Sequence, residues 1–341
     1  MYRLVFCVAL LCQPGRTATA ADQLIYLRSD TVELGVLLAA GGRAVVLRRP
    51  GGENLLDSPP ALWDAASIPE PQTPWAFSLV GGHMTWVSPQ AAWWDQQHVT
   101  DQHASDWPPD PWLIHGRYVV ERQTATAMDV VGPPSPICGL QLHKRYELVE
   151  SGVRLTTVAT NVRTTAVRWG LWSNLHPRPD STPFIPMATD GALRVDHKTS
   201  APKSSGIPGY AYVDGFFSIP FPADSAHDAV HLSGKFFLNP SEPWMASVGD
   251  TWAILVRTAG AMPAAVAPGE APSEVYYDRW LDRSRPALLE LEHQGPITTV
   301  NPGAQLKLSE TWYVVDYGGP ATDPARARFV RQWIDRLGQV P

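Results

Sequence analysis

The chain has 341 residues, of which 44 % are hydrophobic and 18 % are charged, so it can bury a sizeable core and does not have the composition of a disordered chain. Its formal net charge is −6, and an acidic chain without a basic stripe argues against nucleic acid as a partner. Its 33 prolines interrupt helices and central strands, which indicates short strands joined by long, ordered loops.

Residues 1–20 have the pattern of a secretory signal peptide. Arg3 precedes the apolar run Leu4–Cys12, and Ala18-Thr19-Ala20 is a cleavage-type triplet. The run is too short to span a membrane, and no later stretch is long and apolar enough. We therefore expect a periplasmic or secreted protein without an integral membrane segment after cleavage. Cleavage would leave Cys138 as the remaining cysteine, so no intrachain disulfide can form.

Short alternating or apolar stretches follow the signal and predict a succession of strands. The predicted strands are 32–36, 44–47, 118–123, 125–131, 140–149, 153–161, 167–172, 231–238, 252–258, 288–294 and 306–314. Residues 58–111 and 181–222 are rich in proline with little periodicity, and we interpret both as loop regions.

The C-terminal tail has the pattern of a helix docked on a sheet. Asp323 can cap its N-terminus, with Pro324 at the first helical position. Its apolar residues share one face; they are Phe329, Val330, Trp333, Ile334 and Leu337. Many strands and one terminal helix predict an all-β fold, a large two-sheet antiparallel β-sandwich. We divide the chain into a signal (1–20), a β-sandwich domain (21–318) and a helical tail (319–341).

Tryptophans are concentrated in the first loop region. Seven of the fourteen fall in or beside it: Trp63, Trp75, Trp86, Trp93, Trp94, Trp107 and Trp112. Buried aromatic rings can hold loops against a core. A flat apolar ring with a polar edge also suits a sugar, which presents C–H groups on its faces and hydroxyls around its rim. The sequence leaves both roles open.

Acidic and histidine residues lie in the same region, namely Asp95, His98, Asp101, His103 and Asp106. Their spacing matches no established metal motif, so we expect a solvated polar loop and assign no metal site. The sequence also lacks the motifs of serine hydrolases, nucleotide-binding enzymes and zinc ribbons.

Three histidines occupy positions from which they could act as acids or contact a ligand. His83 follows Gly81-Gly82, His115 precedes Gly116, and His176 ends a strand rich in aromatic residues. A structural role is the alternative for each. The strand at 288–294 places Glu292 on one face, where a carboxylate could transfer protons if that face lines a cavity. Otherwise this face is a solvated surface.

Several segments, in order, resemble the galactose mutarotase-like superfamily over about residues 24–317. Leu34-Gly35-Val36, Gly41-Gly42-Arg43 and Asn54-Leu55-Leu56 resemble its first strands. Gly81-Gly82-His83, the segment 107–111 and the strand 139–146 resemble a bacterial subgroup of the DUF4380 type. Leu291-Glu292-His293-Gln294, with Pro302-Gly303, is similar to the C-terminal motifs of aldose 1-epimerases.

The resemblance implies roles for particular residues. The glutamate of the Leu-Glu-x-Gln motif is the catalytic base of aldose 1-epimerases, and it corresponds to Glu292. Their acid is a histidine in a Thr-Asn-His-x-Tyr segment. No histidine stands at that place here, and His176 follows a few residues later. His176 and His83 are therefore the candidate acids.

Two functions are consistent with these residues. The first is a sugar epimerase or mutarotase that needs no cofactor, and the second is a non-catalytic carbohydrate-binding domain on the same fold. Either would have a carbohydrate as its ligand. The candidate sugar contacts are Trp86, Trp107, Trp112, His115, Trp172, Asn174, Arg178 and Gln294.

Overall fold

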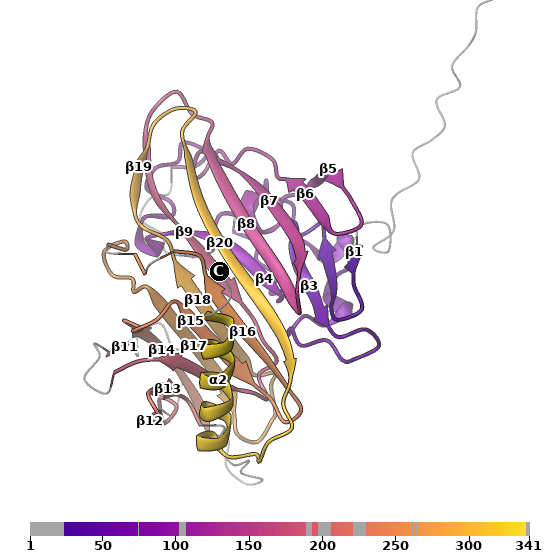
Figure 1. Ribbon diagram of the computed structural model, residues 1–341. Coiled ribbons are helices and arrows are strands. Elements are labelled where there is room, and N and C mark those ends of the chain that lie inside the picture. Colours follow the sequence, from indigo (N-terminus) through magenta and orange to yellow (C-terminus); the bar gives the residue numbers. More distant parts are fainter. Residues whose placement is uncertain are drawn as a thin grey trace, which may run out of the picture.

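The computed structural model describes residues 24–73, 75–101, 107–188, 193–196, 206–220, 230–260, 262–263 and 265–338. The predicted signal peptide lies outside these residues. Within them the protein consists of antiparallel β-sheets and a C-terminal helix, α2 (Asp323–Gly338), which confirms the predicted all-β class (Figure 1). Shorter turns of helix are α1 (Pro111–Ile114), η2 (Pro60–Leu62), η3 (Ala65–Ser67) and η4 (Gln90–Ala92). No described helix has the length and apolar character needed to cross a membrane.

The strands form three sheets. A small sheet contains β1 (Leu24–Arg28), β2 (Glu33–Leu37) and β3 (Arg43–Arg48). The ten-stranded sheet has the order β12 (Ala211–Val213), β13 (Phe216–Ser218), β10 (Thr182–Pro186), β15 (Trp244–Val248), β16 (Trp252–Thr258), β20 (Gln305–Asp316), β8 (Gly152–Asn161), β7 (Leu140–Val149), β6 (Ala127–Val131) and β5 (Val119–Gln123).

The seven-stranded sheet carries the residues of interest. Its order is β11 (Leu193–Asp196), β14 (His231–Leu238), β17 (Ser273–Trp280), β18 (Leu288–Gln294), β9 (Val167–Leu175) and β19 (Thr298–Val300). β4 (His83–Ser88) also pairs with β9. β18 is therefore a central strand, hydrogen-bonded to β17 on one side and β9 on the other.

The two large sheets pack face to face. Leu289 and Leu291 of β18 belong to a buried cluster with Ile185 of β10 and Met245 of β15, so this cluster joins the inner faces of both sheets. The opposite face of the ten-stranded sheet is covered by α2, where Val330 and Ile334 are buried. The predicted docking of the terminal helix is confirmed.

The predicted loop regions contain strands that the sequence pattern concealed. β4 lies within the first region, and β10, β12 and β13 lie within the second. Proline explains why β10 was missed, because Pro183 and Pro186 are normally incompatible with central strands. Pro183 pairs with β15 alone and Pro186 with β13 alone, so each faces an unpaired side where no N–H is needed. β15 and β17 were also not predicted.

Candidate functional site

One face of the seven-stranded sheet is polar and yet buried. Alternation along β18 puts Glu290, Glu292 and Gln294 on this face and the core leucines on the other. The register places Asn174 of β9 and Glu274 of β17 on either side of Glu292. We call this surface the carboxylate face; it consists of Trp172, Asn174, His176, Lys235, Glu274, Glu290, Glu292 and Gln294, all of which are buried.

The burial decides between the two interpretations of Glu292. Its side chain is 0 % exposed, so the interpretation of this face as a solvated surface is wrong. A central strand has neighbours on both sides, and here the outer face is covered as well. A carboxylate in such a place needs partners, because burying an unpaired charge is very costly.

Lys235 and Trp172 supply those partners. Glu292 Oε2 accepts hydrogen bonds from Trp172 Nε1 at 2.7 Å and from Lys235 Nζ at 2.9 Å. Lys235 Nζ also lies 2.9 Å from Glu274 Oε2 and 4.4 Å from the centre of the Trp172 ring. Among the described residues, Glu292 Oε1 has no hydrogen-bond partner. One oxygen is thus fixed, and the other remains available to a ligand.

The charges on this face shift the pKa values of its acids in opposite directions. Burial raises the pKa of Glu292 well above its ordinary value, and Lys235 opposes the shift while Glu290 and Glu274 add to it. Burial also acts to raise the pKa of Glu290, but His176 and Lys235 hold it below its usual range. The His176 Nε2 to Glu290 Oε1 distance is 3.0 Å. Glu292 is therefore the carboxyl on β18 that takes up a proton more readily.

Several buried polar atoms on this face have no partner among the described residues. They are Trp86 Nε1, both amide atoms of Asn174, Glu292 Oε1 and Gln294 Oε1. The register makes them neighbours, because Trp172 pairs with Trp86 and Gln294 while Asn174 pairs with Glu292. Buried polar groups are nearly always hydrogen-bonded. Donors and acceptors set together in this way fit a ligand with several hydroxyl groups.

Tryptophans border these atoms. Trp86, Trp93 and Trp172 are in mutual contact, with ring centroids 4.9 to 5.9 Å apart. The Trp107 ring lies 6.4 Å from that of Trp93 and is 46 % exposed, so the aromatic cluster reaches the surface. Four of the predicted sugar contacts, Trp86, Trp172, Asn174 and Gln294, thus lie together, and Trp107 connects with them.

His83 lies on the other face of the sheet. Its Nε2 is 2.8 Å from Glu310 Oε1 of β20 and 2.9 Å from Ser173 Oγ, in the space between the two large sheets. Burial lowers the pKa of His83. His83 is separated from Glu292 by the thickness of the sheet, whereas His176 shares the face of Glu292.

The remaining predicted contacts make their interactions elsewhere. His115 Nε2 is 3.5 Å from the Ser78 carbonyl oxygen, and burial, with help from Arg43, lowers its pKa to about 4. Arg178 pairs with Asp180 at 2.5 Å and with Glu53. Trp112 is half-buried against the main hydrophobic core.

Lys235, Glu274 and Glu270 are the important residues that the sequence patterns did not identify. Glu270 accepts a hydrogen bond from the Gln90 backbone N–H at 2.8 Å, and burial together with Glu274 raises its pKa to about 7. The available signal was Lys235 itself, a lysine inside the apolar strand that continues with Phe236 and Phe237.

The acidic loop provides no metal site in the part that the structure describes. Asp95, His98 and Asp101 are exposed, while His103 and Asp106 lie outside the described residues. Within the described ranges, no group of three or more His, Cys, Asp or Glu side chains is arranged to hold a metal ion. Cys138 is buried, and burial raises the pKa of its thiol well above the ordinary value.

Solved structures of galactose mutarotase-like proteins share this fold. The chain matches the Slr1438 protein of Synechocystis sp. PCC 6803 with a TM-score of 0.56 and 15 % identity, covering 93 % of this chain and 100 % of that one. A galactose mutarotase-like protein from Lactobacillus casei ATCC 334 matches with a TM-score of 0.55 and 10 % identity, covering 86 % and 100 %. Another from Clostridium acetobutylicum has a TM-score of 0.53 and 12 % identity, covering 87 % and 97 %.

Comparison of the sequence with curated proteins finds no match. A family model described as a domain of unknown function, DUF4380, matches residues 22–315, which include both large sheets and every residue of the carboxylate face. The chain therefore belongs to the DUF4380 family and has the galactose mutarotase-like fold.

Proposed function

We propose that this protein binds a saccharide on the carboxylate face. The observation that carries the proposal is the group of buried donors and acceptors without partners on Trp86, Asn174, Glu292 and Gln294. A sugar offers hydroxyls for such atoms and apolar C–H faces for the neighbouring tryptophans. The names of the two galactose mutarotase-like relatives agree with this ligand class.

Calorimetric titration with a panel of aldoses and disaccharides tests the binding. Asn174→Leu keeps the volume of the side chain but removes both amide atoms next to Glu292, so it should weaken binding at least tenfold, about the effect of losing one or two hydrogen bonds. Gln305→Leu, which removes an exposed amide on β20, is the matched control and should bind normally. The proposal fails if no saccharide binds the folded wild type, or if both variants bind equally well.

Sugar epimerisation is the second candidate function, and Glu292 and His176 favour it. The free Oε1 of Glu292 would accept the proton of the anomeric hydroxyl, and His176 would protonate the ring oxygen; opening and reclosing the ring then exchanges the anomers. General acid–base catalysis of this kind contributes about 10²–10⁴-fold. However, the residue directly opposite Glu292 is Asn174, an amide that cannot transfer a proton at neutral pH.

Anomer exchange followed by NMR separates the two functions. If the protein is an epimerase, Glu292→Gln should reduce the catalysed rate at least a hundredfold, because the glutamine cannot accept the proton. Equal rates for the wild type, the variant and buffer would exclude catalysis and leave saccharide binding as the function.

We also infer that the protein is exported to the periplasm or secreted, on the basis of the signal pattern at residues 1–20. N-terminal sequencing of the protein recovered outside the cytoplasm should begin at or near Ala21. Recovery of the uncleaved chain from the cytoplasm alone would contradict this inference.

A further inference from the structure

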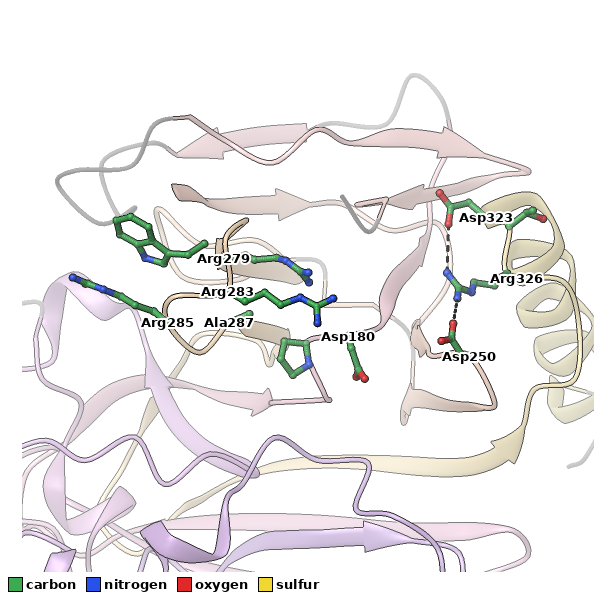
Figure 2. A pocket seen from close by; sticks show the side chains of 12 residues that line it. Asp180, Asp250, Arg279, Arg283, Arg285, Ala287, Asp323 and Arg326 are labelled. Atoms are coloured by element: carbon green, nitrogen blue, oxygen red, sulfur yellow. Dashed lines mark hydrogen bonds and ion pairs between the residues drawn. The ribbon is translucent and has the colours of Figure 1, made fainter. Parts of the chain in front are cut away.

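A second site lies at one end of the sandwich, away from the carboxylate face. It is a cavity of about 730 Å³ formed by the β9–β10 and β15–β16 connections, the end of β17 with the turn after it, and the start of α2 (Figure 2). Its size falls within the range of small-molecule sites. Its lining includes four arginines, Arg279, Arg283, Arg285 and Arg326, and three acids, Asp180, Asp250 and Asp323.

The strand geometry separates the cavity from the carboxylate face. Glu274, Tyr276 and Asp278 of β17 alternate onto the carboxylate face, so Arg279 projects from the opposite side of the sheet. The cavity also begins at the far end of β18, because Ala287 lines it while Glu292 lies five residues further on, about 16 Å along an extended strand.

The wall carries a positive charge in an acidic protein. Its four arginines outnumber its three acids, and the acids are engaged by particular cations. Asp250 Oδ1 lies 2.9 Å from Arg326 Nη2, and Asp323 is 3.9 Å from the same guanidinium. Asp180 pairs with Arg178, which lies outside the cavity lining. The net charge of the wall is therefore at least +1, in a chain whose overall charge is −6.

Arg279, Arg283 and Arg285 come from one short segment. Arg279 is 5 % exposed at the end of β17, and the two others stand on the exposed turn that follows. Figure 2 shows the guanidinium groups of Arg279 and Arg283 close to one another, facing the same space. The turn holds Arg283 at φ 55°, a backbone conformation uncommon for a residue other than glycine, with its N–H donating to the Trp280 carbonyl at 3.0 Å.

Trp280 is not available as a platform for a sugar ring. His231 stacks on it with a centroid distance of 4.6 Å and an interplanar angle of 6°, and the Arg285 guanidinium lies 4.9 Å from its centroid. The ring instead helps to fix the direction of Arg285. What the cavity offers a ligand is therefore a set of planar, permanently charged donors, which match carboxylate, sulfate and phosphate groups through paired hydrogen bonds.

We propose that this cavity binds a small molecule through an oxyanion group, a carboxylate, sulfate or phosphate, held by Arg279, Arg283 and Arg285. The positive end of α2 contributes to the attraction, since Thr322 and Asp323 at its start also line the cavity. The site is independent of the saccharide site proposed above, and neither requires the other.

Calorimetric titration of the full chain with inorganic phosphate, sulfate, citrate and glucuronate tests the proposal, with neutral glucose as the reference ligand. At least one anion should bind, more weakly at higher ionic strength. The double variant Arg283→Gln and Arg285→Gln should weaken its affinity at least tenfold, while both substitutions lie on an exposed turn and leave the buried Arg279 in place. Comparison of the four anions shows which oxyanion the arginines prefer.

A double variant with the same change of charge on distant strands, Arg122→Gln and Arg154→Gln, is the control and should bind the anion like the wild type. Asn174→Leu should also leave anion binding unchanged, which separates this site from the saccharide site. The proposal is overturned if none of the anions binds, if the turn variant retains wild-type affinity, or if the control variant loses affinity to the same extent.

Discussion

Lys235 is the cation that makes the carboxylate face compatible with burial. It lies 2.9 Å from both Glu274 and Glu292, and the two carboxylates raise its pKa above the ordinary value although burial acts to lower it. Lys235→Met would leave two buried carboxylates without their cation, and removing one partner of such a group costs about 3–5 kcal/mol. We expect a loss of this size in the free energy of unfolding measured with urea.

The exposed Lys307 on β20 provides the control for that measurement. Lys307→Met removes the same charge where water already solvates it, so the urea midpoint should stay at the wild-type value. A Lys235→Met protein as stable as the Lys307→Met protein would show that Lys235 does not neutralise the face.

Glu270 gives the protein a pH dependence of stability. Burial and the neighbouring Glu274 raise its pKa from the ordinary 4.5 to about 7 in the folded protein. The folded state therefore binds the proton more tightly than the unfolded state, and this stabilisation is complete below about pH 4.5 and is lost as the pH rises towards 7. Its size is up to about 3 kcal/mol, from 1.36 kcal/mol per pKa unit.

The difference in unfolding free energy between the wild type and Glu270→Gln, measured from pH 4 to 8, isolates this contribution. The wild type should lose stability relative to the variant between about pH 4.5 and 7, with a constant difference above that range. A difference that does not change with pH would show that Glu270 titrates normally.

At this residue scale the sequence identified part of the site. Glu292, Trp172, Asn174 and Gln294 lie where the motif and the strand pattern indicated. Lys235 is 57 residues before Glu292 and on a strand separated from β18 by β17, so no local pattern connects the two. His83 was misleading, because its position after two glycines does not reveal which face of β4 it occupies.

Among the elements, α2 is the one that sequence periodicity described most fully. Its apolar positions recur at helical spacing, and the structure buries Val330 and Ile334 against the ten-stranded sheet. Ile334→Ala removes three methyl or methylene groups from this contact and should lower the free energy of unfolding by about 2–5 kcal/mol. The exposed Gln332 of the same helix is the control, and Gln332→Ala should have the stability of the wild type in the same urea titration.

The result bears on whether α2 is part of the fold or an appendage. An Ile334→Ala protein with unchanged stability would mean that the helix does not contribute to the stability of the sandwich. The short strands β10, β12 and β13 show the opposite case, since three to five residues interrupted by proline carry too little periodicity to be identified from sequence.

In the molecule as a whole, β20 joins the separate hydrophobic clusters into one structure. Leu306, Trp312 and Val314 belong to the largest cluster, while Val315 belongs to the cluster beneath α2. A single strand shared by both should make unfolding cooperative. Tryptophan fluorescence and far-UV circular dichroism should therefore report the same urea midpoint, and two distinct midpoints would show that the clusters unfold independently.

The all-β class and the sandwich could be predicted at this scale because the number of alternating segments and the near absence of helical periodicity leave few architectures. The polar, buried outer face of the seven-stranded sheet could not. Strand alternation shows that Glu290 and Glu292 share a face, but it does not show whether loops distant in sequence cover that face.

A crystal structure of the protein with the saccharide that binds most tightly in titration would test the central claim most directly. The account predicts that sugar hydroxyls lie within hydrogen-bond distance of Glu292 Oε1 and the Asn174 amide, with Trp86 or Trp172 beside the ring. A sugar bound with full occupancy elsewhere, with these atoms still without a ligand, would contradict the claim.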